Sequence, residues 1–577
     1  MAADPEAWGV ATSYVDASGQ RRSVPAATVE AMLDAMCASG RPPAPQEKGP
    51  GAGRPEPGAS DGRCPAPPAG RHWGVAVQLY ATRSESSWGI GDLSDLARLA
   101  SWAESVGARF VLINPLHAVA PTHPQQPSPY YPASRCFYNP IYLRVEDVAG
   151  AEAAPSLPSA AREGRGLNAE PRIDRDRVWR LKSRVLEEAF ARAGVQDDDL
   201  DAYIEQRGDA LVGFATYCAL AERHGPVWSD WPAGFRHPRS PEVAAWSATE
   251  AAATRIRYHC WLQWQLDRQL RRAASAGAGL VADLAVGVDP GGADAWWWQD
   301  TFVTDMRVGA PPDAFNPNGQ DWALPPLDPW RLEKDGFAPF IETIRAGFRH
   351  AAGMRVDHVM GLFRLFWIPS GAPATEGTYV RYPAERMLDI LSAEARRSGA
   401  FVVGEDLGTV EPGVRSRLSE RGVLSYRLLY FEDAPPESWP EAALGAVTTH
   451  DLPTIAGVWS GTDRVCLSDI GFAPDDSEYA VMGQKLAESA GSPPDAPVGE
   501  VIAGAYGAVA GSPCALVAAT LDDMLGVELR PNVPGTVDES PDWCLALPKP
   551  IEQIEADPLV SAVAGVMRRL RPRAHRR

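Results

Sequence analysis

The chain is 577 residues long, with 45% hydrophobic and 22% charged residues, a composition typical of a globular protein with one large domain and attachments. Its formal net charge of −19 argues against nucleic acid as a partner, because phosphate backbones are bound by clustered Lys and Arg. No apolar run approaches the ~20 residues that a membrane-spanning helix needs, so we expect no membrane partner either.

The cysteines and the N-terminus indicate in which cellular compartment the protein is found. The eight cysteines are scattered along the chain without any CxxC pair, which favours reduced thiols over a disulfide framework or a zinc site. The first residues lack a basic stretch followed by an apolar one, so no secretory signal is predicted. We therefore expect a cytoplasmic protein.

Two short regions precede the main domain. Residues 1–38 are predicted to be a small helical segment, because SVPAATVEAMLDAM has a Ser/Pro start and apolar positions at helical spacing. In residues 39–70, sixteen of 32 residues are Pro or Gly. Such a stretch cannot bury a core, so it is predicted to be an extended or disordered linker. Residues 71–577 are then predicted to form the main domain.

From Trp73 onward, apolar strands alternate with helical stretches. About 160 residues separate the second strand from the third, too many for a loop, and they contain amphipathic helices such as DRVWRLKSRVLEEAFARAG. A mostly helical insertion is therefore predicted at about 118–278. The alternation predicts the α/β class, as a (β/α)₈ TIM barrel. Its eight strands are expected in WGVAVQLY, ARFVLINPLHA, GLVADLAVGV, GMRVDHVMG, AFVVGEDLG, VLSYRLLYFE, AVTTHDLPT and ALVAATLDDMLG.

Three of these strands deliver an acid at their end, namely Asp357, Glu405 and Asp451. Active sites of such barrels lie at the C-terminal ends of the strands. Because side chains alternate between faces along a strand, Arg355 shares a face with Asp357, and Thr449 shares one with Asp451. Glycosidic-bond chemistry needs a carboxylate nucleophile facing a protonated carboxylic acid. One such acid would most simply be an ordinary polar residue, but three in one barrel pattern predict a catalytic site.

Longer motifs resemble a known family from about Trp73 to about Trp543. Any one of them is a weak signal, but their number and order along the chain are specific. They are SPYYPASRCFYNPIYL, DLAVGV, VGAPPDAFNPNGQDW, MRVDHVMGLFRLFWIP, VVGEDLGTV, SYRLLYFE, THDLPT and PNVPGTVDESPDW. On these residues the chain is identified as a member of glycoside hydrolase family 77, the 4-α-glucanotransferases of the amylomaltase type.

The resemblance implies three catalytic roles. Asp357 matches the nucleophile, Glu405 the general acid/base, and Asp451 the carboxylate that stabilises the oxocarbenium-like sugar. Arg355 would keep Asp357 ionised, since an opposite charge within ~4–6 Å favours the carboxylate. Partial burial and the neighbouring Asp357 would raise the pKa of Glu405, so that it holds its proton near neutral pH. A spacing of ~5–5.5 Å between these two carboxyls would give net retention.

The resemblance also implies substrate contacts. Tyr130 would stack beneath the sugar bound to the nucleophile, and His450 would bind hydroxyls of the sugar at the cleavage site. NPNGQDW resembles the mobile loop over the acceptor side, and this chain has Ala323 where the family usually has Gly after the Trp. The expected substrate-binding residues are Tyr130, Asp283, Gln320, Trp322, Arg355, Asp406, His450 and Asn532.

Two further features have structural interpretations. By strand periodicity His358 points away from the face of Asp357, so it is interpreted as structural. Trp296, Trp297 and Trp298 could form a sugar platform, but core packing is favoured because they follow Pro290-Gly291-Gly292 at a helix start.

We therefore expect a retaining transferase that acts on maltooligosaccharides and α-1,4-glucans. It would pass a glucan segment to the 4-hydroxyl of glucose or another glucan through an ester on Asp357. No cofactor and no metal are expected, because the acids act as free carboxylates and no His/Asp cluster has a ligand spacing. An α-1,4-glucan hydrolase of the amylase type and an inactive glucan-binding protein remain alternatives, and the sequence does not indicate an oligomeric state.

Overall fold

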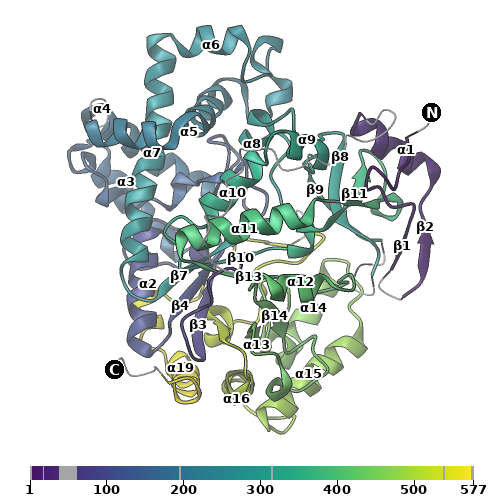
Figure 1. The fold of residues 1–577 in the computed structure, drawn as a ribbon. Coiled ribbons are helices and arrows are strands. Elements are labelled where there is room, and N and C mark those ends of the chain that lie inside the picture. The colour runs from purple at the N-terminus through teal and green to yellow at the C-terminus, as the bar shows by residue number, and fades with distance from the viewer. Residues whose placement is uncertain are drawn as a thin grey trace.

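The computed structural model describes residues 3–16, 19–37, 62–193, 197–313, 316, 318–536 and 540–572. Its centre is a barrel of eight parallel strands surrounded by helices (Figure 1). Leu424 closes the barrel, because it accepts a hydrogen bond from Gly404 N–H at 2.8 Å and donates one to Val402 O at 2.9 Å. Seven of the eight predicted strands are confirmed, as β3 (His72–Val77), β4 (Phe110–Ile113), β7 (Gly279–Leu284), β10 (Gly353–Val356), β13 (Phe401–Gly404), β14 (Ser425–Leu428) and β16 (Leu516–Thr520). The seventh strand in chain order, β15 (Ala443–Ala446), lies before the stretch AVTTHDLPT in which it was predicted and shares only Ala446 with it.

Side chains along each strand point alternately into the barrel and towards the surrounding helices. Phe110 and Leu112 of β4 pack with inward residues of the other strands, whereas Val111 and Ile113 belong to the cluster that contacts the helices. A Cβ on Gly74 would lie 2.4 Å from the Phe110 ring, so only glycine leaves room for that ring. The barrel is therefore a packed core, and its site belongs at the mouth. The outer helices include α2 (Leu93–Val106), α10 (Ala338–Gly347), α11 (Ala384–Ser398), α12 (Val414–Glu420), α16 (Val498–Gly511) and α19 (Pro558–Leu570).

The predicted helical insertion lies between β4 and β7, at the top of Figure 1. It begins with a short antiparallel pair, β5 (His117–Ala118) and β6 (Ser134–Tyr138). Its last helix, α7 (Glu250–Ala274), packs against both the insertion and α2, so the insertion continues into the outer layer of the barrel. The other helices of the insertion are α3 (Leu157–Gly166), α4 (Arg175–Ala193), α5 (Asp198–His224) and α6 (Pro241–Ser247).

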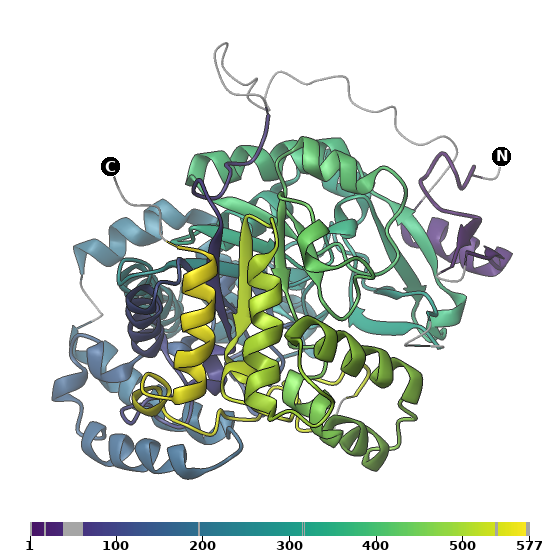
Figure 2. The same cartoon turned by 90° about the horizontal axis from the view of Figure 1, so that it is seen from below.

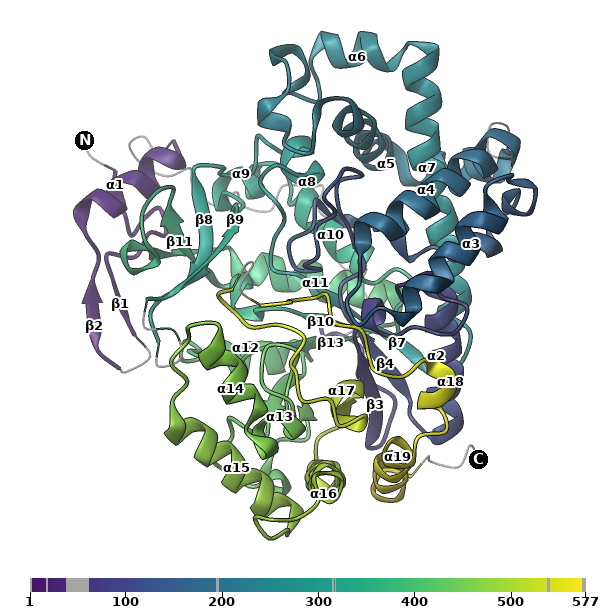
Figure 3. The ribbon, with the colours of Figure 1, turned by 180° about the vertical axis from the view of Figure 1, so that it is seen from behind.

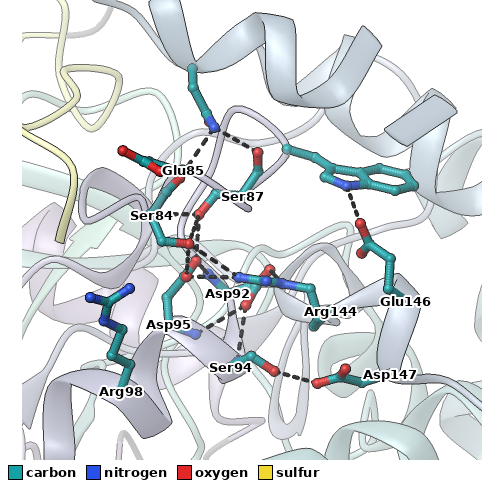
Figure 4. Close-up of polar contacts among 12 residues, drawn as sticks. Ser84, Glu85, Ser87, Asp92, Ser94, Asp95, Arg98, Arg144, Glu146 and Asp147 are labelled. Carbon is teal, nitrogen blue, oxygen red and sulfur yellow. Dashed lines mark hydrogen bonds and ion pairs between the residues drawn. The ribbon is translucent and has the colours of Figure 1, made fainter. Parts of the chain in front are cut away.

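A buried polar cluster joins the barrel to this insertion (Figure 4). Asp92 caps α2 by accepting hydrogen bonds from two backbone N–H groups of its first turn. Asp95 accepts the hydroxyls of Ser84 at 2.5 Å and Ser87 at 2.6 Å. Arg144, from the insertion, binds both carboxylates and lies 2.7 Å from Asp95. The guanidinium thus compensates two buried negative charges and fastens the insertion to the first barrel helix.

An antiparallel sheet, which the sequence analysis did not predict, stands beside the mouth. Its strands pair in the order β12–β11–β8–β9. Two of them follow β7 and two follow β10, so the sheet forms through distant pairs such as Val308 with Trp367. The prediction of mostly helical additions is therefore incomplete. The strands are β8 (Met306–Ala310), β9 (Gln320–Leu324), β11 (Arg364–Pro369) and β12 (Thr378–Arg381), and the short helices α8 (Ala293–Trp297) and α9 (Pro329–Lys334) lie in the same part of the chain.

The N-terminal segment contains the helix α1 (Ala26–Ala35) and also a hairpin of β1 (Ser13–Val15) and β2 (Arg21–Ser23). The prediction of a helical segment missed this hairpin, whose strands are only three residues long. Figure 2 shows the segment at one end of the molecule, where Ala11 N–H donates to Tyr379 O of β12 at 2.9 Å. The segment therefore extends the edge of the antiparallel sheet.

Most of the predicted linker, residues 39–61, lies outside the described residues. In its described part, Cys64 is buried and donates its N–H to Arg421 O at 2.7 Å, so this stretch is docked on the barrel.

The C-terminal third of the chain adds a helical group between β15 and α16. It consists of α13 (Ile455–Ser460), α14 (Thr462–Asp469) and α15 (Asp476–Ala490). After α17 (Leu521–Met524) the chain runs past the barrel strands towards α18 (Ile551–Ile554), as Figure 3 shows. No helix in the described ranges is long and apolar enough to cross a membrane.

Candidate active site

Asp357 and Glu405 stand at the barrel mouth on neighbouring strands. β10 ends at Val356 and β13 at Gly404, and the register pairs these two residues, so the acids that follow them lie side by side. The ladder continues past the strand ends, because Glu405 N–H donates to Val356 O at 3.0 Å. The structure thus brings together the two acids that the strand pattern predicts at one place.

Arg355 organises a chain of polar groups beside these acids. The residue is buried, and its Nη2 donates to Asp357 Oδ1 at 2.8 Å. Its Nη1 donates to both oxygens of Asp283, at 2.7 and 2.9 Å. The Tyr130 hydroxyl donates to the same carboxylate at 2.6 Å. Four of the expected site residues therefore form one continuous hydrogen-bonded chain that ends at Asp357.

Burial controls the ionisation of the two acids. It raises the pKa of Asp357 to about 6, although the Arg355 guanidinium acts in the opposite direction. The Arg355 guanidinium thus acts in the direction that the sequence analysis expects, but burial and the charge of Asp283 outweigh it. Burial and the Asp357 carboxylate raise the pKa of Glu405 to about 7. Glu405 therefore holds its proton more strongly than Asp357 does.

Asp451 reaches the site from a loop. β15 already ends at Ala446, so the expected strand alternation of Thr449 and Asp451 does not hold. Two partners orient the carboxylate: Asn532 Nδ2 donates to Oδ1 at 2.7 Å, and His450 Nε2 lies 3.2 Å from Oδ2. Burial alone would raise the pKa of Asp451, but these partners lower it to about 2. The same pairing raises the pKa of His450 against the effect of burial.

Three aromatic rings meet next to these acids. Tyr130 stacks on His450 with ring centroids 4.8 Å apart and an interplanar angle of 21°. Trp543 contacts both rings, at 5.2 Å from Tyr130 and 5.4 Å from His450. It comes from the segment that passes the barrel after β16, and it ends the motif PNVPGTVDESPDW. The sequence analysis assigned it no role in the site. Aromatic faces beside a few polar groups are typical of ligand sites.

Gln320 and Trp322 lie on β9, at the edge of the antiparallel sheet. Trp322 Nε1 donates to Gln320 Oε1 at 3.0 Å, and the Trp322 ring contacts the His358 ring edge to face at 5.2 Å. Since His358 directly follows Asp357, this contact places Trp322 near Asp357. Ala323 has a φ of +57°, a left-handed conformation that favours glycine. The alanine therefore introduces backbone strain next to Trp322.

Asp406 directly follows Glu405, and its carboxylate binds residues outside the expected site. It is 1% exposed, and its carboxylate accepts hydrogen bonds from Ser425 Oγ at 2.6 Å and Arg415 Nε at 2.9 Å. Its second oxygen accepts from Tyr426 N–H at 2.8 Å. With both oxygens engaged by β14 and α12, its contacts are those of a residue that fastens β13 to β14.

Other sequence features also have a place in the structure. Trp296 is fully buried, and a Cβ on Gly213 would lie 2.4 Å from the Trp297 ring, so both rings pack in the core as interpreted. Within the ranges that the structure describes, no group of three or more His, Cys, Asp or Glu side chains could hold a metal ion.

A cavity of about 40 Å³ lies at the mouth, and four of the expected site residues line it. Asp522, two residues beyond the end of β16, lines it as well. Burial and the charge of Asp523 raise the pKa of Asp522 to about 7. The sequence analysis missed Asp522, although an acid just after the eighth strand is the signal that pointed to the other three acids.

Comparisons with known proteins agree with this geometry. The family described as 4-alpha-glucanotransferase, glycoside hydrolase family 77, matches residues 77–550. The 4-alpha-glucanotransferase of Mycobacterium tuberculosis is 42% identical over 86% of this chain and 75% of its own length. That of Haemophilus influenzae is 31% identical over 83% of this chain and 76% of its own length.

Solved structures give the same result. The amylomaltase from Corynebacterium glutamicum superposes with a TM-score of 0.84 at 30% identity, covering 97% of this chain and 98% of that one. The amylomaltase from Streptococcus agalactiae in complex with acarbose shares the fold, with a TM-score of 0.71 at 17% identity over 87% of this chain and 99% of that one. The chain belongs to glycoside hydrolase family 77, the 4-α-glucanotransferases.

Proposed function

We propose that Asp357, Glu405 and Asp451 perform the glucan transfer that family membership assigns to this chain. The observation that carries the proposal is the pair of acids on neighbouring strands with different ionisation. Near neutral pH, Asp357 is the acid that gives up its proton first and Glu405 is the one that keeps it. A nucleophile and a general acid need these two states.

In the first half-reaction an oxygen of Asp357 attacks C1 of a glucosyl unit in the donor. The bond from C1 to the 4-oxygen of the next unit breaks, and the proton of Glu405 passes to that oxygen. The products are a glycosyl ester on Asp357 and a shortened glucan. Asp451 stays ionised because its pKa is about 2, so it stabilises the positive charge that develops on the sugar.

In the second half-reaction Glu405 takes the proton of an acceptor 4-hydroxyl. The acceptor oxygen attacks C1, the ester bond breaks, and Asp357 leaves as a carboxylate. Two inversions at C1 give net retention. Transfer prevails over hydrolysis when an acceptor is held near Glu405 and water is excluded. Trp322 and Gln320, beside His358, support an acceptor position at this edge of the mouth.

The remaining contacts suggest how the sugar at the cleavage site is held. We assign it to Tyr130, Asp283, His450 and Asn532, because their bonds connect them to Arg355 or Asp451. Asp406 is left out of this set and assigned to the scaffold. Maltooligosaccharides are the proposed substrates. The eight cysteines are free thiols, which supports the cytoplasm as the compartment.

Incubation with pure maltotriose tests the function. Transfer produces glucose together with a ladder of longer maltooligosaccharides, while the number of reducing ends stays constant. Glucose and maltose alone, with rising reducing ends, would instead mean hydrolysis. Unchanged maltotriose would mean an inactive binder. Chromatography of samples taken over time, with a reducing-end assay in parallel, separates the three outcomes.

A further inference from the structure

A second cavity, of about 30 Å³, lies outside the barrel wall and adjoins the one at the mouth. It is enclosed by β4 and β7 on one side and by residues of α7 and α10 on the other. His117 and Arg135, from the β5–β6 pair, line it together with Arg349 and His350. Ile113, Asn114 and Asp283 line both this cavity and the one at the mouth, so the two cavities adjoin at the ends of β4 and β7.

His117 presents an unpaired N–H to its surroundings. The side chain is 7% exposed, and its Nε2 accepts the N–H of Ala285 at 3.4 Å. Burial and the charge of Arg135 lower the pKa of His117 to about 3, so the ring is neutral. With Nε2 as acceptor, its single proton is on Nδ1. That nitrogen is buried and has no hydrogen-bond partner in the described part of the chain.

Arg135 presents a second unpaired N–H. Its Nη1 donates to the carbonyls of Ala285 at 3.0 Å and Val286 at 2.7 Å, just after β7. Its Nε is buried and, among residues 3–572 that are described, finds no acceptor. A buried donor without an acceptor is costly, and most such groups in proteins have a partner. Two of them on neighbouring side chains that line one cavity indicate an occupant that accepts hydrogen bonds.

The other polar groups around the cavity already have partners. His350 Nε2 lies 2.9 Å from Asp267, and Arg349 also binds that carboxylate. Both oxygens of Asp283 accept hydrogen bonds from Arg355. No buried side-chain acceptor on the described lining residues lacks a partner. A water molecule would bring two further hydrogens that need acceptors, whereas an anion brings none.

We propose that this cavity binds one small monovalent anion, a halide of the size of chloride, between His117 Nδ1–H and Arg135 Nε–H. The volume of about 30 Å³ leaves room for a small ion. The guanidiniums of Arg135 and Arg349 supply the positive charge. Because Arg135 also holds the carbonyls after β7, the ion stabilises the end of the strand that carries Asp283.

Halide titration of the full chain tests this site. Thermal unfolding is measured while chloride or bromide replaces gluconate, which is too large for the cavity, at constant ionic strength. A bound halide raises the unfolding midpoint along a saturable curve, because a ligand stabilises by RT ln(1 + [L]/Kd). Crystals soaked in bromide then show an anomalous peak within hydrogen-bond distance of His117 Nδ1 and Arg135 Nε. A cavity filled by water only, without the peak or the saturable rise, would overturn the proposal.

Matched variants separate this site from a general salt effect. Arg135→Gln removes the Nε donor and is expected to abolish the halide-dependent rise. Arg571→Gln is the control, because Arg571 likewise binds backbone carbonyls, such as Ser512 O at 2.9 Å, but neither Arg571 nor Ser512 lines the cavity. It is expected to lower the midpoint and to keep the halide response, and loss of the response in this control would refute the assignment. If Arg135→Gln does not fold, the bromide peak in the unaltered chain decides.

Discussion

The Asp357→Asn variant is expected to be inactive and yet more stable than the unaltered chain at pH 8. Burial raises the pKa of this carboxyl from 3.8 to about 6, so the folded state opposes the loss of its proton. A pKa unit corresponds to ~1.4 kcal/mol, so a shift of about two units gives up to ~3 kcal/mol. Because the Asp357 side chain is 19% exposed, solvent screening reduces this free-energy cost. We expect the variant to gain ~1–2 kcal/mol, because Asn keeps an oxygen that can accept from Arg355.

The sign of this effect depends on pH. A carboxyl whose pKa is raised on folding costs no stability below pH ~4, where it is protonated in both states, and its cost grows as the pH rises to about 6. Calorimetry should therefore find the midpoint of the variant ~1–2 °C higher at pH 8 and nearly unchanged at pH 4.

Asp476→Asn is the control, because the side chain of Asp476 is 79% exposed. It is expected to change neither midpoint. A lower midpoint of Asp357→Asn at pH 8, or the same difference at both pH values, would refute the reasoning that burial of the charge opposes folding.

The rate of transfer should follow a bell-shaped pH profile with limbs near the pKa values of Asp357 and Glu405, about 6 and about 7. Measurement of kcat/KM for maltotriose tests this, and a plateau that reaches pH 9 would contradict it. Arg144→Met should destabilise the fold by ~3–5 kcal/mol in denaturant unfolding, because it leaves two carboxylates, 1% and 2% exposed, without their cation. Arg165→Met, at a 49% exposed arginine, should lower the free energy of unfolding by less than ~1 kcal/mol. Equal losses of stability in the Arg144 and Arg165 variants would contradict this prediction. Ala323→Gly should stabilise the chain by ~0.5–1 kcal/mol through relief of its left-handed backbone, and a lower midpoint in thermal unfolding would show that no strain is stored there.

The barrel could be predicted from the sequence because its signals are local. Each of the eight strands is a short apolar run, and Asp357 and Glu405 directly follow two of them. The antiparallel sheet could not be predicted in this way. Its strands pair across long stretches of chain, as Val308 does with Trp367, and no local pattern specifies such partners.

The difference between local signals and contacts of distant chain segments also explains which site residues were predicted and which were missed. Trp543 contacts Tyr130 only because the chain returns past the barrel, so its role depends on tertiary structure. The charge state of Asp357 likewise depends on burial and on the sharing of Arg355 with Asp283, neither of which the strand pattern contains. Asp522 is different, because its place after β16 could have been recognised from the sequence.

Trapping the glycosyl ester tests the central claim, the role of Asp357 as nucleophile, most directly. In a Glu405→Gln variant, an α-maltosyl fluoride donor needs no acid for its leaving group, while the missing base slows the second half-reaction. Mass spectrometry of the digested protein should then find the maltosyl mass on the peptide that contains Asp357. An adduct on the peptide of Asp283 or Asp451, or release of fluoride without any adduct, would contradict the assignment.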